Sequence, residues 1–362
     1  MTERAPRWAR AVLVLGLILI VVGGGGALAA QLVVDRWDRA VGKDELLAPQ
    51  ARQPAESAGE TASSGPPTTP GQSPEPSAAP TPGPTPTAGT GDSRSGQSRR
   101  TAVTGPLTYL VIGTDSRGGG GGRADAIVIA HVTDDLRHAY LISIPRDLLV
   151  PIPGHWQDKI NAAYQLGGAQ LLSATLHDLT GIGFDGAAVL DFAGFREVID
   201  AIGGVELCLD REIRSIHTGA VFPAGCQRLD GAQALDLARQ RYDLPRGDLD
   251  RGVNHQRLIR AMIDQAASAD LLTNPIKLDR TIRAVGDAVT VDTGGIPLPE
   301  LAYALRQLRP SRIVGITLPS YPQNIDGISY VLADPAADGL YRAVRESKLA
   351  DWAREHDQWR ND

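Results

Sequence analysis

The stretch LVIGTDSRGGGGGRADAIVIAHV, Leu110–Val132, decides the fold of this chain. It contains two apolar runs joined by five consecutive glycines, and a third apolar run, HAYLISIP, follows at 138–145. The runs are rich in Ile, Val and Leu without a regular polar alternation, which is typical of strands buried on both faces of a sheet. We therefore predict three strands at the centre of an α/β sandwich.

The glycine run 118–122 lacks the features of a nucleotide-binding loop. No Lys-Ser or Lys-Thr pair follows it, and it lies between two predicted strands rather than before a helix. It is therefore predicted to be a compliant connection. Asp115 and Arg117 end the first strand, and Arg123 and Asp125 begin the second. If the two strands are neighbours, these four side chains converge at one end of the sheet, where α/β proteins place ligands.

Further charged residues fall at the predicted ends of later elements. A surface salt bridge contributes only ~0–1 kcal/mol, so stability gives little reason to gather them. Arginine forks and carboxylate-held Mg²⁺ would suit a diphosphate. The pattern alone leaves two interpretations open, a phosphate or pyrophosphate site and a structural ion-pair network. The residues are Arg146 and Asp147 in SIPRD, Lys159 in DKINAAY, Arg239 and Arg241 in ARQR, and Asp248, Asp250 and Arg251 in GDLDR.

The rest of the chain mixes predicted helices and strands. Together they predict an α/β fold over residues 105–362, a three-layer α/β/α sandwich with a central mixed sheet. We expect helices at 160–181, with an interruption at Gly167 and Gly168, and at 230–241, 253–268 and 335–356. The stretch 187–204 is expected to start as a strand and continue as a helix. Further strands are expected at 205–210, 311–320 and 327–334.

The N-terminus has the pattern of a membrane anchor. Arg4, Arg7 and Arg10 precede an uncharged apolar run at 11–34, which exceeds the ~20 residues that a helix needs to cross a bilayer. Because positive flanks stay in the cytoplasm, we predict a cytoplasmic tail at 1–10, a single-pass signal anchor at 11–34 and an extracytoplasmic remainder at the cell membrane. A cleaved signal peptide ending in the small residues ALAA is the alternative, and the length of the run favours the anchor.

Residues 35–104 are predicted to form an extracytoplasmic stalk. From about Leu47 to Thr104 the chain is dense in Pro, Ser, Thr and Gly and has almost no apolar residues. Such a segment cannot bury enough surface to offset its ordering entropy, so we predict a disordered linker that tethers the folded domain. The net charge of −6 gives no reason to expect nucleic-acid binding.

The two cysteines of the chain are Cys208 and Cys226. In an oxidising compartment a disulfide is the default for such a pair, and two buried free thiols are the alternative.

Seven ordered motifs give the chain a family resemblance. The motifs are LVIGTDSR, RADAIVIAHV, LISIPRDLLVPIPG, KINAAYQLGG, DFAGFREVIDAIGGVEL, PAGCQRLDGAQALDLARQR and RGDLDRGVNHQR. They resemble the LytR–CpsA–Psr family, strongly from 106 to 266 and weakly beyond. The resemblance implies an α/β/α enzyme that moves a glycopolymer from a polyprenyl-pyrophosphate carrier to peptidoglycan through a phosphodiester link.

The resemblance also implies roles for individual residues. Asp115 and Asp125 would hold Mg²⁺, with Mn²⁺ as a second possibility. His255 stands where family members usually have Gln, and Gln256 follows it, which leaves open which of the two contacts phosphate. The pyrophosphate contacts would come from Arg123, Arg146, Arg239, Arg241 and Arg251, with Asp248 orienting them and Arg117 and Lys159 in support.

Several functional points stay open at the level of sequence. Asp147 is a candidate general base by position, although a capping or supporting role is favoured. The carrier's tail would need an apolar groove, which the segments 160–179 and 187–199 could line, although ordinary core packing is favoured for them. Two rival functions remain, a non-catalytic polymer- or lipid-binding module and a simple pyrophosphatase. The groove residues expected from those segments are Leu171, Leu172, Phe192 and Phe195.

Overall fold

The computed structural model describes residues 42–53, 103–115, 122–240, 248–268, 281 and 289–361. The predicted tail, the predicted anchor and most of the predicted linker lie outside these residues. Within the described ranges, no helix has the length and apolarity needed to cross a membrane.

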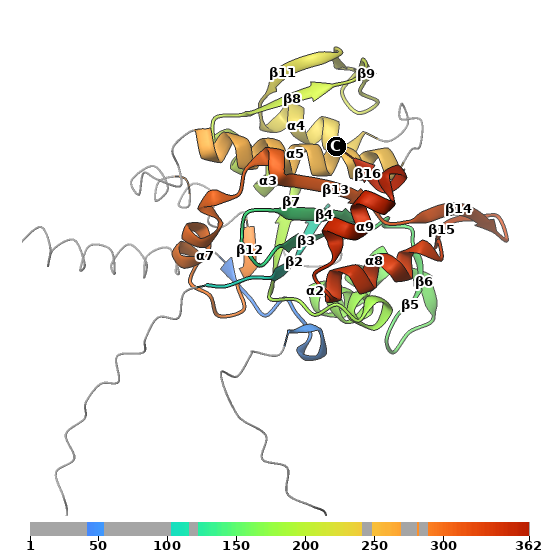
Figure 1. The fold of residues 1–362 in the computed structure, drawn as a ribbon. Helices are drawn as coiled ribbons and strands as arrows, with labels where there is room; N and C mark the ends of the chain where they lie inside the picture. Colours follow the sequence, from blue (N-terminus) through green and yellow to red (C-terminus); the bar gives the residue numbers. More distant parts are fainter. Residues whose placement is uncertain are drawn as a thin grey trace, which may run out of the picture. The chain divides into compact units, whose positions relative to one another are not determined.

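A mixed eight-stranded sheet forms the centre of the fold (Figure 1), with the strand order β1-β12-β7-β2-β3-β4-β13-β16. The central strand β2 runs parallel to β7 and antiparallel to β3, and β4 runs parallel to β13. The sheet confirms the predicted central mixed sheet. Its strands are β1 (Gly42–Lys43), β2 (Leu107–Thr114), β3 (Ala124–Val132), β4 (Ala139–Ser143), β7 (Gly186–Asp191), β12 (Val289–Asp292), β13 (Ile313–Thr317) and β16 (Arg360–Asn361).

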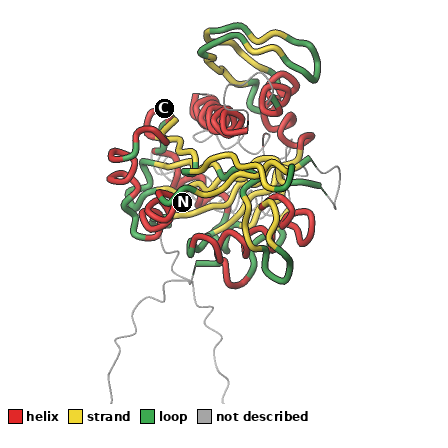
Figure 2. The backbone as a smooth tube through the Cα atoms, turned by 90° about the vertical axis from the view of Figure 1, so that its right-hand side faces the viewer, coloured by secondary structure: helices red, strands yellow, loops and turns green. Residues whose placement is uncertain are grey.

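Helices cover both faces of this sheet (Figure 2). The core on one face joins the strands to α2 (Ile160–Thr180), α8 (Ala336–Arg345) and α9 (Leu349–Glu355). The opposite face packs against α5 (Asp248–Ser268) and α7 (Leu298–Ala304). The helices α3 (Phe192–Ala201) and α4 (Gly231–Arg239) join a further core with α5. This is the layering that the sequence predicted.

The strands β8 (Val205–Leu209) and β11 (Gly225–Leu229) form a separate antiparallel pair, beside the short pair β9 (Ile213–Arg214) and β10 (Val221–Phe222). Cys208 and Cys226 are cross-strand partners in the first pair and form a disulfide. The predicted disulfide is therefore confirmed in the structure.

Two helix boundaries differ from the sequence prediction. The predicted C-terminal helix is divided into α8 and α9, because Ser347 adopts a left-handed conformation with φ of 54°. Helix α5 begins at Asp248 rather than at 253, so the residues DLDR at 248–251 form its first turn instead of remaining a loop. The predicted interruption of α2 is confirmed, since Gly167 and Gly168 both have non-helical backbone angles.

The segment Gly42–Gln53 belongs to the folded unit, which corrects the predicted stalk boundary. Strand β1 pairs in parallel with β12, and Leu47 and Ala51 are almost fully buried. The Arg52 guanidinium lies 2.8 Å from Oδ2 of Asp292. The short apolar run LLA, at 46–48, supplies enough apolar surface to pack, which the polar composition of the following linker obscured.

Two hairpins leave the sheet near the ends of β4 and β13 (Figure 1). The first pairs β5 (Leu149–Pro151) with β6 (Gln157–Lys159), and the second pairs β14 (Ser320–Ile325) with β15 (Ile328–Ala333). Strand β14, SYPQNI, was not predicted because it is polar and contains a proline.

Candidate functional site

The charged residues around the glycine run meet at one edge of the sheet. Thr114 at the end of β2 pairs with Ala124 at the start of β3 and with Asp191 at the end of β7. Strand β4 runs antiparallel to β3 and therefore ends at this edge as well. The strands that flank the glycine run are therefore neighbours, which was the condition for their charged ends to converge.

Asp125 occupies a β-bulge in β3. Gly113 pairs with Ala126 and Thr114 pairs with Ala124, so Asp125 is the extra residue of the bulge. Bulges re-aim side chains and are common beside active sites. Here the Asp125 carboxylate forms an ion pair with Arg146. The bulge thus directs Asp125 toward the residues that follow β4.

Asp115 holds the two ends of the glycine connection together. Its amide donates to the carbonyl of Arg123 across 3.2 Å, and its Oδ1 accepts from the Arg123 amide at 2.6 Å. The Arg123 side chain is exposed beside this contact. Arg117, on the other side of the connection, lies outside the described residues.

Asp115 and Asp125 fit a hard divalent cation. Within the described ranges, Oδ2 of each carboxylate makes no hydrogen bond, and no group of three or more His, Cys, Asp or Glu side chains gathers to hold a metal. Mg²⁺ typically takes one or two protein carboxylates and completes its shell with water and substrate phosphate. A pair of carboxylates from neighbouring strands therefore suits Mg²⁺ better than a metal that needs a full protein cage.

Asp147 lies between two cations. Its Oδ1 is 3.2 Å from Nζ of Lys159, and its Oδ2 is 3.8 Å from Nε of Arg146. The side chains of Arg146 and Asp147 are 16% and 15% exposed, so these charges are mostly shielded from solvent. Because both carboxylate oxygens face cations, a role in orienting Arg146 and Lys159 fits Asp147 better than proton abstraction.

Arg251 reaches the same bulge from helix α5. Its side chain is buried, and its Nη2 donates to the carbonyl oxygen of Asp125 at 3.2 Å. The next residue, Gly252, allows the helix to approach β4, since a Cβ there would lie 3.2 Å from Cβ of Ser143. The close packing of α5 on β4 therefore places Arg251 at the site.

Arg239 lies at the end of α4, with its guanidinium 5.0 Å from the centre of the Phe192 ring. This geometry is a cation–π contact and holds the exposed arginine near the start of α3. Arg241 lies outside the described residues. Asp248 begins α5, and its side chain is not among those described.

His255 and Gln256, the two candidates for a phosphate contact, both make hydrogen bonds within the protein. His255 donates from Nε2 to the carbonyl of Ala238 at 2.9 Å; burial, together with the nearby Arg251 charge, lowers its pKa to about 4. Its single N–H is therefore used within the protein at neutral pH. Gln256 is fully buried and donates to the carbonyls of Leu141 and Ile316. Gln256 therefore ties α5 to the sheet, and a phosphate contact from either residue stays a prediction.

A large apolar cavity opens beside these charges. It has a volume of about 610 Å³ and lies between α3, α4, α5 and α7 and the strands β2, β3 and β4. Asp125, Arg146, Arg239, Arg251 and His255 contribute its polar lining. The apolar lining includes Val111, Val128, Phe192, Phe195, Met262 and Leu301.

The groove alternative thus holds for one candidate segment, and the favoured core packing holds for the other. Phe192 and Phe195 line the cavity, whereas α2, with Leu171 and Leu172, packs in the core on the other face of the sheet. The sequence AIVIA at 126–130 could have indicated this cavity, because Ala126, Val128 and Ala130 all face it. Small side chains on that face leave volume that the larger isoleucines fill on the opposite face.

The site therefore combines two features that suit an amphipathic ligand. Arginines present forks that bind phosphate oxygens, and the adjoining cavity offers apolar surface of a size usual for ligand pockets. An anionic head and an apolar tail would both find partners here.

Comparisons with known proteins identify relatives of the chain. The chain is 33% identical over 262 residues to the cell wall biosynthesis protein LcpA of Corynebacterium glutamicum, covering 65% of this chain and 49% of LcpA. It is 31% identical over 184 residues to the polyisoprenyl-teichoic acid–peptidoglycan teichoic acid transferase TagU of Bacillus cereus, covering 51% of this chain and 60% of TagU. The matched region thus spans about half of LcpA.

The fold is similar to the crystal structure of TagV from B. subtilis, with a TM-score of 0.58 and 25% identity over 68% of this chain and 98% of TagV. The model of the LytR_cpsA_psr family matches residues 85–344, which include most of the described domain. The chain therefore belongs to the LytR_cpsA_psr family.

Proposed function

We propose that this protein transfers a phosphorylated glycopolymer from a polyprenyl-pyrophosphate carrier to peptidoglycan, forming a phosphodiester link during cell-wall assembly. The names of the relatives support the general activity, since LcpA is a cell wall biosynthesis protein and TagU a teichoic acid transferase. The carrier, the metal and the location at the outer face of the cell membrane are further parts of the proposal.

The observation that carries the proposal is the position of the arginines at the apolar cavity. Arg146, Arg239 and Arg251 all contribute to the lining of a cavity that is otherwise mostly hydrophobic. A polyprenyl chain would occupy the apolar part, and its pyrophosphate would meet the guanidinium groups. A soluble phosphate ester would have no use for the apolar part.

The proposed reaction is a phosphoryl transfer. A sugar hydroxyl of the acceptor attacks the phosphorus next to the glycopolymer and loses its proton, while the bond to polyprenyl phosphate breaks. Negative charge on the phosphate oxygens is stabilised by fixed positive groups, which is the main requirement of this chemistry. Arg146 and Arg251 are suited to it because Asp125, Asp147 and the packing of α5 hold them in place.

Asp115 and Asp125 are the residues that would hold Mg²⁺ or Mn²⁺. When bound, the ion would neutralise charge on the pyrophosphate. The predicted anchor at 11–34 and the linker would keep the domain close to a membrane-held substrate, at high effective concentration.

The test follows phosphate release from a polyprenyl pyrophosphate by the full-length protein in the presence of Mg²⁺. We expect Asp125→Ala and Arg146→Ala to lose turnover, whereas Arg342→Ala, an exposed arginine on α8, should retain it. Binding without turnover in the unmodified protein would favour the binding module, and release without transfer to peptidoglycan would favour the pyrophosphatase. The absence of both binding and turnover would refute the pyrophosphate site.

A further inference from the structure

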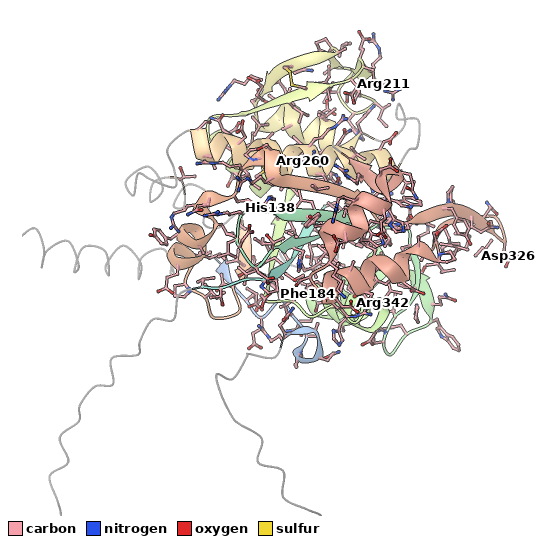
Figure 3. The ribbon with its side chains drawn as sticks, viewed as in Figure 1. His138, Phe184, Arg211, Arg260, Asp326 and Arg342 are labelled. Atoms are coloured by element: carbon pink, nitrogen blue, oxygen red, sulfur yellow. A yellow bond between two sulfur atoms is a disulfide. The ribbon has the colours of Figure 1, made fainter. Side chains whose placement is uncertain are left out.

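The β14–β15 hairpin carries an exposed apolar and aromatic face. Cross-strand partners share a face of a hairpin, and the register pairs Tyr321 with Leu332, Gln323 with Tyr330, and Ile325 with Ile328. Tyr321 is 44% exposed and Ile328 is 50% exposed. Figure 3 shows Asp326 at the far end of the hairpin, well away from the sheet. We call the six residues Tyr321, Gln323, Ile325, Ile328, Tyr330 and Leu332 the hairpin face.

The root of the hairpin is attached to the proposed catalytic site. The amide of Val331 donates to the carbonyl of Asp147 at 2.9 Å, and Nζ of Lys159 lies 5.5 Å from the centre of the Tyr330 ring. The same Lys159 is paired with Asp147, which faces Arg146. A continuous series of contacts therefore joins the hairpin face to the arginine that would bind pyrophosphate.

We propose that the hairpin face binds the saccharide chain of the acceptor and brings its hydroxyl toward Arg146. This inference rests on the proposed function and identifies the acceptor side of the same site. The C–H groups of a sugar ring carry partial positive charge and pack on the electron-rich face of an aromatic ring. Tyr321 and Tyr330 supply such rings, and Gln323 supplies amide groups for sugar hydroxyls.

The charge of the hairpin favours a saccharide over a membrane. Surfaces that bind anionic lipid combine apolar side chains with Lys and Arg. Residues 320–333 contain no Lys or Arg, and their one charged residue is the acidic Asp326. A nearly neutral face with one exposed tyrosine, Tyr321, and one half-buried tyrosine, Tyr330, matches the chemistry of an uncharged glycan backbone.

The two substrates would then reach Arg146 from different elements. The apolar cavity is built by α3, α4, α5 and α7 against β2, β3 and β4, whereas the hairpin follows β13. Strands β4 and β13 end side by side, with Ser143 opposite Thr317. Donor and acceptor can therefore be present together, which direct transfer between them requires.

The test measures binding of soluble glycan strands, prepared from peptidoglycan with their lactyl groups kept as amides so that the backbone stays uncharged, to the full-length protein by calorimetry. We expect Tyr321→Ala and Tyr330→Ala each to raise the Kd about tenfold, equivalent to about 1.4 kcal/mol. Tyr330→Phe, which keeps the ring, should bind like the unmodified protein. Tyr303→Ala removes an exposed tyrosine from α7 and serves as the matched control.

Donor chemistry is followed in the same variants as phosphate release from polyprenyl pyrophosphate, and Tyr303→Ala should leave this release unchanged. If Tyr330→Ala lowers the melting temperature, Tyr330→Leu takes its place, because it keeps apolar bulk without an aromatic face. Unchanged glycan affinity in all variants would overturn the proposal. So would unchanged glycan affinity combined with lost binding to phosphatidylglycerol vesicles, which would identify a membrane contact. If the unmodified protein releases no phosphate from polyprenyl pyrophosphate, the proposed function is refuted instead. Its glycan binding would then stand as a separate result.

Discussion

Nη2 of Arg251 donates a hydrogen bond to the carbonyl oxygen of Asp125 across 3.2 Å, joining residues that are 126 positions apart. The contact links the first turn of α5 to the bulge in β3. It makes the position of Arg251 depend on the backbone of the same residue whose carboxylate pairs with Arg146. The arginines and the candidate metal ligand are thus parts of one rigid arrangement.

Replacing Arg251 with lysine should impair turnover although the charge is kept. Lysine cannot present two donors in a planar fork to both a carbonyl and a phosphate. We expect kcat/KM for the polyprenyl-pyrophosphate substrate to fall by about ten- to a hundredfold, in the range of losing one preorganised donor. Arg257→Lys on the same helix, where the arginine pairs with Asp210, should have little effect. Equal activity of the two variants would contradict the assigned role.

The Asp147→Asn variant distinguishes between two roles of Asp147, orientation of Arg146 and Lys159 or action as a general base. If Asp147 orients Arg146 and Lys159, the amide should weaken substrate binding and leave the shape of the pH–rate profile unchanged. A general base contributes about 10²–10⁴-fold, and its removal would abolish the acidic limb of the profile. Steady-state kinetics between pH 5 and pH 9 decide between the two, and loss of that limb would restore Asp147 as the base.

His255 should make folding stability sensitive to acid. Its folded pKa of about 4 lies below the ordinary value of 6.5, so the unfolded chain takes up a proton first as the pH falls. The neutral form is favoured above pH 6.5, and stability is lost progressively between pH 6.5 and pH 4. From pH 7 to pH 5 this corresponds to about 2 kcal/mol.

The measurement is the free energy of unfolding in urea at pH 7 and pH 5, for the unmodified protein and for His255→Gln. Glutamine can still donate to Ala238 but does not titrate, so the variant should lose about 2 kcal/mol less between the two pH values. Other titrating groups are common to both proteins and cancel in this comparison. The same pH dependence in both would show that His255 is not buried in its neutral form.

Filling the apolar cavity should select against long lipid tails. Ala130 lines the cavity, and Ala130→Leu would occupy part of its 610 Å³. We expect a higher KM for carriers with long prenyl chains and little change for short ones, because only the long chains need the filled space. Ala130→Ser, which keeps the side chain small, is the control. An equal rise in KM for both chain lengths would place the tail elsewhere.

The segment at 42–53 should contribute measurably to stability. Leu47 is 1% exposed in the core, and Leu47→Ala should lower the free energy of unfolding by about 2–5 kcal/mol, as for other buried leucines. Gln50→Ala changes an exposed residue of the same segment and should be nearly neutral. Urea unfolding of the two variants tests this, and equal stability would mean that the segment does not pack in solution.

From the sequence alone, the continuous apolar runs at 107–114, 124–132 and 139–143 identified the central strands, because a strand buried on both faces has little room for polar residues. The same runs placed Asp115, Asp125 and Arg146 at strand ends, and the cysteine pair was expected to form the disulfide that the structure contains. These features depend on local composition or on the direct continuation of a strand.

Tertiary structure alone decided the remaining features, because each depends on residues far apart in the chain. The bulge at Asp125 comes from the register between β2 and β3, and the cavity comes from small side chains on β3 facing α5 and α7. Gln256 and His255 are neighbours in sequence, yet the turn of the helix directs Gln256 into the sheet and leaves His255 at the cavity. A linear pattern records which side chains are available, whereas the packing of α5 on β4 determines which of them meet at the site.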